Sequence, residues 1–262
     1  MNFECKAWYL SHRGKVRQGN EDSLLLGSKV VTRENEGAVC SWEDRPSVPF
    51  CIAVADGMGG HKAGERASAL CCESLEAMKV DTEEQLKETL CDINGVVFRE
   101  SRQDPDLSGM GTTVAGLAFI EEGVFAFNVG DSRVYRVQND QFLNKITKDD
   151  TPAQALEDAG AWEHDEVRPE NSHSLTQALG GSVKLREINP NTYPCGLRDR
   201  ATYLLCTDGL TDMIGLDEME KALEAETPDS IVSALFEEAM RAGGKDNVSI
   251  IYLQIERYSN GK

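Results

Sequence analysis

Three short acidic turns constrain this chain more than any other feature of its sequence. Each places an aspartate between an apolar run and glycines or small polar residues: Asp56 within Val54–Gly60, Asp208 within Cys206–Gly209, and Asp246 within Gly244–Asn247. Carboxylates at strand ends in separate parts of a chain supply the oxygen ligands that Mg²⁺ and Mn²⁺ prefer. A bridged pair of such ions can turn water into a nucleophile near neutral pH. The pattern therefore points to chemistry on phosphate.

Two further segments add to this pattern. Asp131 is a fourth aspartate at a strand end, and the Arg17–Ser23 segment contributes Glu21 and Asp22. Arg17 offers a planar fork that suits a phosphate. Taken alone, an Asp-Gly pair is a common turn, and the Arg17–Ser23 segment has the character of a polar surface loop. Four strand-end aspartates together favour a functional site.

Composition argues against several classes of function. The 262 residues include 45 Asp and Glu against 27 Lys and Arg, and this net charge of −18 repels nucleic acid. The eight cysteines form no Cys-x-x-Cys and the four histidines stand apart, which argues against a zinc site. No apolar stretch approaches the roughly 18 residues of a membrane span, and no secretory leader precedes Cys5. We expect a cytoplasmic monomer with reduced thiols and no membrane partner.

Strand patterns, either buried apolar runs or apolar alternation, recur along the chain. They occupy Phe3–His12, Ser23–Gly27, Phe50–Ala55, Thr112–Ile120, Val124–Val129, Arg133–Gln138, Phe142–Ile146, Leu185–Asn191, Ala201–Cys206 and Val248–Ile255. Asn139-Asp140 predicts a two-residue hairpin turn. The polar and irregular Ser28–Pro49 segment predicts a loop, or an excursion between strands.

Helical patterns fall in two pairs. In the first pair, one helix lies between Ala67 and Met78, and the other begins at Thr82, where Gln85 predicts a capping box. In the second pair, Asp217 with Glu220 predicts the cap of one helix, and the other begins at Thr227-Pro228 and ends at Gly243-Gly244. A further helical pattern lies around Ala153–Ala159. This order is not the strict alternation of a parallel α/β sheet, so an α+β fold of packed antiparallel sheets with outer helices fits best. Without linkers or repeats, residues 1–262 are expected to form a single domain.

An ordered set of motifs resembles a known family. In chain order it comprises Arg17 with Glu21-Asp22, Val54–His61, Gly111–Thr113, Val129–Arg133, Leu175–Gly180, Thr207–Leu210 and Asp246-Asn247. Any one of these motifs is weak, whereas the ordered set is highly specific. From about Trp8 to Ile255, the chain resembles the bacterial branch of the metal-dependent type 2C serine/threonine protein phosphatases.

The resemblance implies a fold and a site. The fold would be a central sandwich of two antiparallel β-sheets flanked by pairs of α-helices, four layers in αββα order. The site would hold two Mn²⁺ or Mg²⁺ ions in a cleft at one end of the sandwich, and a third ion often occurs in bacterial members. The resemblance assigns Asp56 to both ions, Asp208 and Asp246 to the first, the Gly57 carbonyl with Glu21 and Asp22 to the second, and Asp131 with Asp208 to the third. Arg17 matches the arginine that grips the substrate phosphate.

These roles imply a metal-dependent protein serine/threonine phosphatase. A metal-activated water would hydrolyse phosphoserine or phosphothreonine in one step, and phosphorylated proteins, substrates of a cognate Ser/Thr kinase, would be the partners. A catalytically silent phosphatase-like module that binds phosphoproteins is an alternative, against which stand the four aspartates Asp22, Asp56, Asp208 and Asp246. Another metal-dependent phosphohydrolase, such as a nuclease, is disfavoured by the acidic charge.

The sequence also departs from the family pattern. Met58 occupies the position where eukaryotic members have a histidine that is proposed as the general acid. His61 could protonate the leaving oxygen or cap the following helix, and both interpretations stay open. The flap, at about residues 149–181, has Asp149–Thr151 where Asp-His-Ser is commoner, and an acidic Glu163–Glu166 segment, so substrate preference is open. The long Ser28–Pro49 segment could be a docking surface or a plain connection.

Overall fold

The computed structural model describes residues 2–32, 37–60, 62–161, 174–196 and 199–258. Within these residues the strands form two six-stranded sheets and one small three-stranded sheet, and neighbouring strands are antiparallel in all three. The first sheet has the order β11-β10-β14-β15-β1-β4. Its strands are β1 (Phe3–His12), β4 (Cys40–Asp44), β10 (Arg133–Gln138), β11 (Phe142–Lys145), β14 (Arg200–Cys206) and β15 (Val248–Arg257).

The second sheet has the order β13-β9-β8-β5-β2-β3. Its strands are β2 (Ser23–Leu26), β3 (Lys29–Val31), β5 (Phe50–Ala55), β8 (Val114–Ile120), β9 (Gly123–Val129) and β13 (Asn191–Pro194). The small sheet comprises β6 (Gly57–Met58), β7 (Gly111–Thr112) and β12 (Leu179–Gly180). Because β6 follows β5 directly, the small sheet extends the second sheet just beyond Asp56.

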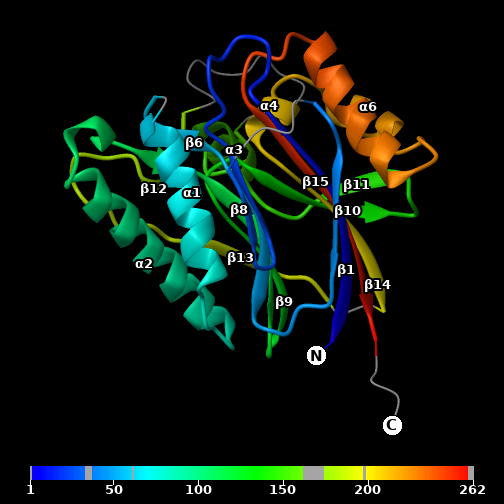
Figure 1. Ribbon diagram of the computed structural model, residues 1–262, viewed down its shortest axis with the longest axis horizontal. Coiled ribbons are helices and arrows are strands. Elements are labelled where there is room, and N and C mark those ends of the chain that lie inside the picture. The colour runs from blue at the N-terminus through cyan, green and yellow to red at the C-terminus, as the bar shows by residue number, and fades with distance from the viewer. Residues whose placement is uncertain (1, 33–36, 61, 162–173, 197–198, 259–262) are drawn as a thin grey trace.

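Helices α1 (Lys62–Glu76) and α2 (Glu83–Ser101) cover the outer face of the second sheet, and α5 (Leu216–Ala222) and α6 (Pro228–Arg241) cover that of the first. The described residues also form two shorter helices, α3 (Pro152–Asp158) and α4 (Asp208–Thr211), and a 3₁₀ turn at Pro105–Leu107. Figure 1 shows α1 and α2 together on one side of the molecule and α6 on the other. In the part of the chain that the structure describes, no helix is long and apolar enough to cross a bilayer.

Three apolar clusters hold these layers together. The middle cluster lies between the two large sheets and is centred on aromatic rings: Phe119 stacks on Phe50 at 4.3 Å between centroids and meets Phe3 edge-on at 5.1 Å. A second cluster packs α1 and α2 against the second sheet, and a third packs α5 and α6 against the first sheet. The layers therefore follow the order α, β, β, α, which confirms the predicted α+β sandwich.

Most of the predicted elements are present with small shifts at their ends. Asn139 and Asp140 both have positive φ, at 51° and 56°, as the predicted two-residue hairpin turn requires. The Thr82 hydroxyl accepts a bond from the Gln85 N–H, which confirms Thr82 as the N-cap, although the Gln85 side chain accepts from the N–H of Asp81 instead. The predicted strand Thr112–Ile120 is divided between β7 and β8.

Two local predictions were wrong, and the structure decides between the two alternatives for a third segment. The segment Leu185–Asn191 is not a strand; β13 begins only at Asn191, because Leu185 is exposed and no strand among the described residues pairs with it. Asp217 does not cap α5, which begins after Gly215 without a side-chain cap bond. The polar segment Ser28–Pro49 is not a plain loop, since it contains β3 and β4, and β4 pairs with β1 at the edge of the first sheet.

The middle cluster predicts where the fold is most sensitive to truncation. We expect Phe119→Ala to lower the free energy of unfolding by about 3–5 kcal/mol, because it removes a buried ring and leaves a cavity between the sheets. Urea unfolding followed by circular dichroism measures this loss. The same substitution at the exposed Phe142 is the matched control and should change the free energy by well under about 1 kcal/mol. Equal losses for the two variants would contradict the central position of Phe119.

Candidate active site

Four aspartates gather where strands of the two large sheets end. Asp22 directly precedes β2, Asp56 follows β5, Asp208 begins α4 just after β14, and Asp246 lies just before β15. Burial raises the pKa of Asp56 well above its usual value, and the charges of Asp22 and Asp208 raise it further. The adjacent carboxyl group of Asp208 therefore contributes to the raised pKa of Asp56.

Asp22 joins the two large sheets. Its carboxylate is buried, and its Oδ2 accepts a 3.0 Å bond from the hydroxyl of Thr207, which follows β14. The same hydroxyl accepts a 3.1 Å bond from the backbone N–H of Ser249 in β15. Burial raises the pKa of Asp22 to about 7, although bonds from Ser249 and Thr207 oppose this shift. Thr207 therefore fixes an aspartate of the second sheet to strands of the first.

The small sheet fixes the backbone around Asp56. The Asp56 carbonyl accepts bonds from the backbone N–H of Thr113 and from the hydroxyl of Thr112, both at 2.9 Å. Gly57 then packs so closely on α1 that a Cβ there would lie 2.1 Å from the carbonyl oxygen of Gly64. The turn after Asp56 therefore requires glycine.

Asn247 ties the loop after β1 to the turn before β15. It is buried, its Oδ1 accepts a 2.7 Å bond from the N–H of Glu21, and its Nδ2 donates to the carbonyls of Arg13 and Gly19 at 3.0 and 2.9 Å. One side chain thus satisfies three backbone groups of a loop that is far away in sequence. This arrangement brings the Arg17–Asp22 segment beside Asp246.

Arg17 lies at the rim of the aspartate cluster. Its Nη2 donates to Oδ2 of Asp246 at 2.6 Å, and 54% of its side chain is exposed. The hydrogen bond that Arg17 donates to Asp246 raises the pKa of Arg17, with smaller contributions from the charges of Glu21 and Asp56. The guanidinium is therefore held near the carboxylates while it still faces solvent.

The remaining predicted residues lie around this cluster. Burial raises the pKa of Asp131 to about 8, and the charge of Asp208 adds to the shift, so Asp131 adjoins the four aspartates through Asp208. Glu21 lies with its Oε2 against α1, where a Cβ on Gly64 would be 1.8 Å away from it. His61 lies outside the described residues.

The cluster has the chemistry of a hard-cation site. Among the described residues, Oδ1 of Asp22 and Oδ1 of Asp208 are buried without a hydrogen-bond partner. Buried carboxylates that face one another are costly unless they are protonated, paired or bound to a metal. No three His, Cys, Asp or Glu side chains in the described part of the chain are already arranged to hold an ion. The donor types fit Mg²⁺ or Mn²⁺, and the side chains would have to close around the ion.

Known sequences decide the family of this chain. The sequence model described as protein phosphatase 2C matches residues 37–248. The chain belongs to the protein phosphatase 2C family. It is 32% identical over 265 residues to the serine/threonine protein phosphatase PstP of Mycobacterium tuberculosis, which covers 96% of this chain but only 45% of that relative. It is 31% identical over 267 residues to the serine/threonine phosphatase stp of Listeria monocytogenes, which covers 98% of both chains.

Solved structures of the family share the fold. The crystal structure of the Mycobacterium tuberculosis phosphatase PstP/Ppp matches with a TM-score of 0.79 and 31% identity, covering 97% of this chain and 100% of that one. A crystal structure of the catalytic domain of PstP in complex with two manganese ions matches with a TM-score of 0.76 over the same shares of both chains. The family and its sandwich fold are thus confirmed for this chain, which spans less than half the length of the Mycobacterium tuberculosis relative.

Three supporting residues were not singled out from the sequence. Thr113, Thr207 and Asn247 entered the sequence prediction only as parts of motifs, although all three are buried and hydrogen bond around the cluster. The sequence signal that could have identified these three residues is a small polar residue next to an apolar strand. Such a residue must find a partner inside the protein, and the nearest acidic turn is the first place to look.

The raised pKa values predict a falling stability with rising pH in the metal-free protein. The pKa of Asp208 is raised by burial to about 6, that of Asp22 to about 7 and that of Asp131 to about 8, from 3.8. The folded protein therefore binds these protons more tightly than the unfolded chain does. The resulting contribution to the free energy of unfolding is complete below about pH 4 and is lost as the pH rises through about 6 to 8. We expect the Tm in EDTA to fall over this range, as measured by calorimetry.

A variant isolates the contribution of the cluster to this slope. In Asp22→Asn the amide cannot titrate, so the fall of the Tm with pH should be shallower than in the wild type. Glu121→Gln, in the exposed turn between β8 and β9, serves as the control and should keep the wild-type slope. A wild-type slope in Asp22→Asn would contradict the assignment of the raised pKa to this buried carboxyl group.

Proposed function

We propose that this chain is a metal-dependent protein phosphatase that hydrolyses phosphoserine and phosphothreonine. The observation that carries the proposal is the convergence of four aspartates, two of them with unpartnered buried oxygens among the described residues, beside the guanidinium of Arg17. Clustered carboxylates suit divalent cations, and an adjacent arginine suits a phosphoryl group. Membership of the family, and the names of its relatives, support the same activity.

The donor atoms suggest how two ions would be held. In this proposal Asp56, Asp208 and Asp246 would hold the first ion, Asp56 with the carbonyl of Gly57, Glu21 and Asp22 would hold the second, and Asp131 with Asp208 would hold a third. Bound Mn²⁺ or Mg²⁺ would acidify water and offset charge on the phosphoryl oxygens. The structure of PstP with two manganese ions supports manganese as the first metal to test.

Arg17 is the residue of this chain that would bind the substrate phosphate. Its planar group matches two phosphate oxygens, and its exposed position at the rim gives it access to a protein substrate. In the present arrangement Arg17 is bonded to Asp246, so it would exchange this partner for the phosphate. His61 could donate a proton to the leaving oxygen or cap α1, and both roles stay predictions.

The nearest thiol is not suited to act as a nucleophile. Cys206 lies two residues before Asp208 and is buried, and burial raises its pKa to about 12. A thiol with this pKa stays protonated at neutral pH and attacks phosphorus poorly. This supports direct hydrolysis by water over a covalent cysteine route.

Several expectations stay predictions within this proposal. The partners would be phosphorylated proteins that are substrates of a Ser/Thr kinase. The chain would act as one domain and one subunit in the cytoplasm, with neither nucleic acid nor membrane as a partner. A silent phosphatase-like module is less well supported, because such a module usually loses the aspartates that this chain keeps.

Asp208→Asn tests the metal dependence. We expect the kcat for Mn²⁺-dependent phosphate release from a phosphothreonine peptide to fall by at least about a hundredfold, because the variant removes a carboxylate shared within the cluster. EDTA should abolish the wild-type activity on the peptide and on p-nitrophenyl phosphate. Asp92→Asn, on the exposed face of α2, is the control with the same chemical change. Turnover without metal, or full activity of Asp208→Asn, would overturn the mechanism.

Arg17→Ala tests the phosphate-binding role. We expect the KM for a phosphothreonine peptide to rise about tenfold or more, because a charge-assisted bond to the phosphate is lost, while kcat changes less. Steady-state kinetics with saturating Mn²⁺ measures both constants. Arg200→Ala removes another exposed arginine, which pairs with Glu256 where β14 begins and β15 ends, and should leave both constants unchanged. An unaltered KM in Arg17→Ala would count against the role of Arg17.

A further inference from the structure

Asp131 stands in a tight turn between β9 and β10. The residue before it, Gly130, has a φ of 106°, and a Cβ there would lie 2.6 Å from the Cβ of Thr113. Only glycine fits at this place, so the turn packs closely against Thr113 on one side. The position of the Asp131 carboxylate then depends on the groups that hold the other side of the turn.

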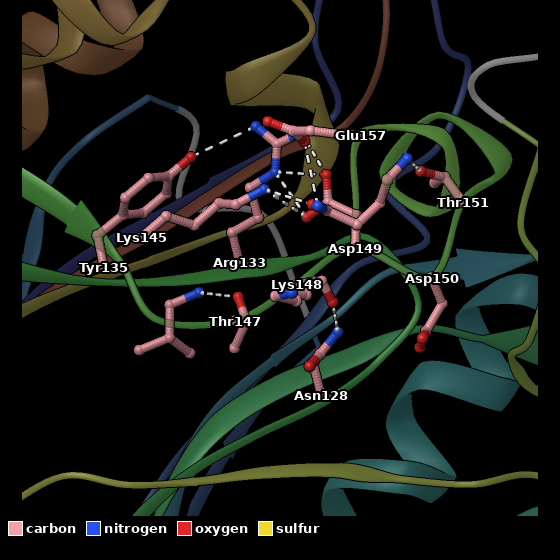
Figure 2. Close-up of polar contacts among 12 residues, drawn as sticks. Asn128, Arg133, Tyr135, Lys145, Thr147, Lys148, Asp149, Asp150, Thr151 and Glu157 are labelled. Carbon is pink, nitrogen blue, oxygen red and sulfur yellow. Dashed lines mark hydrogen bonds and ion pairs between the residues drawn. The ribbon is translucent and has the colours of Figure 1, made fainter. Parts of the chain in front are cut away.

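Two consecutive aspartates, Asp149 and Asp150, hold that other side. Figure 2 shows them pointing in opposite directions, Asp149 toward Arg133 and Asp150 away from it. Asp149 accepts from Nε of Arg133 at 3.0 Å and from Nη2 at 2.7 Å, and both side chains are largely buried. Because Arg133 begins β10 two residues after Asp131, Asp149 fixes the end of the turn.

Asp150 fixes the beginning of the turn, at Gly130. Its Oδ2 accepts a 2.7 Å bond from the N–H of Gly130, and its own N–H donates to the carbonyl of Gly130 at 2.9 Å. The same carbonyl accepts a 3.0 Å bond from Nδ2 of Asn128, which also donates to the carbonyl of Lys148 at 2.7 Å (Figure 2). Asp150 therefore holds both backbone groups of the residue that precedes Asp131.

Asp150 also reaches the flap and the strand that follows it. Its Oδ1 accepts a 3.0 Å bond from Nδ2 of Asn191, the first residue of β13, and its carbonyl accepts a 2.8 Å bond from the N–H of Thr176. Asn191 lies opposite Asn128 in the ladder between β13 and β9. The carboxylate of Asp150 thus joins the Asp131 turn to the edge strand of the second sheet.

A carboxylate is suited to this place because donors bond to both of its oxygens. The N–H of Gly130 bonds to Oδ2 of Asp150, and the amide of Asn191 bonds to Oδ1. An amide side chain offers one acceptor oxygen and a neutral imidazole one acceptor nitrogen, so neither could serve the two donors together. The proposed hydrolysis gives Asp150 no role of its own.

We propose that Asp150 is a positioning residue that holds Asp131 in place for the third metal ion. The proposal rests on the proposed function, since it concerns a ligand of the ion cluster assigned there. Asp131 and Asp208 line one cavity of about 620 Å³, and Asp150 is not among the residues that line it. Asp150 therefore acts through Gly130 rather than on the ion. The affinity for the third ion depends on Asp150, whereas the affinity for the two ions at Asp56 does not.

Calorimetric titration of the full chain with Mn²⁺ tests this role without turnover. We expect the wild type to bind three ions, and Asp150→Ala to raise the Kd of the weakest ion about tenfold or more while the two tighter ions keep theirs, because the variant frees the Asp131 turn alone. Asp150→Asn keeps one acceptor oxygen, so its rise should be smaller, and it carries the test if Asp150→Ala does not fold. Asp158→Ala removes an exposed carboxylate of the neighbouring α3 and should bind as the wild type does.

A double-mutant cycle separates positioning from a general loss of structure. Asp131→Asn should remove the weakest site, and adding Asp150→Ala to it should change neither remaining Kd. A wild type that binds only two Mn²⁺ ions, an unchanged third Kd in Asp150→Ala, or an equal loss for all three ions overturns the positioning role. A wild type that hydrolyses neither a phosphothreonine peptide nor p-nitrophenyl phosphate with Mn²⁺ overturns the proposed function instead, and the binding results stand without it.

Discussion

Mutual repulsion among buried carboxylates is the constraint on which the rest of this structure depends. Asp22, Asp56 and Asp208 come from separate segments, and burial beside one another raises the pKa of each, whereas the partly exposed Asp246 is paired with Arg17. The two large sheets nevertheless bring them together, because each aspartate stands at the end of a strand or directly before one. The protein gives up stability at this point, and a site that attracts divalent cations is what it gains.

The rigidity of the site comes from small polar side chains more than from the aspartates themselves. Thr207 links the first sheet to Asp22 of the second, and Asn247 holds three backbone groups of the loop that carries Arg17. These residues are buried in the sandwich or at its edge, so they are positioned by the same packing that forms the core. Arg17, in contrast, is held by a single exposed ion pair, which suits a group that has to change partners.

The sequence allowed the core strands and the metal-ligand candidates to be predicted, because a buried strand followed by an Asp-Gly turn is a local signal. The pairing of strands that are far apart in the sequence has no such local signal. β4 has a polar pattern because it is an edge strand, and only its register with β1 makes it a strand. Leu185–Asn191 has the composition of a strand but pairs with no strand among the described residues, so Leu185 stays exposed and Ile188 is only partly buried. The contacts of Asn247 were equally hidden, because its partners lie more than two hundred residues away.

The ladder between β1 and β15 has a consequence for the synthesis of the protein. It pairs Phe3 with Arg257 and His12 with Val248, so β1 pairs with a strand that is made more than two hundred residues later. Such contacts are slow to form and expose unpaired strand edges until they are made. On the ribosome, β1 and β14 would therefore wait for β15, and Asp246 and Asn247 would emerge just before it. A nascent chain would complete its aspartate cluster only after the segment that carries Asp246 has been made.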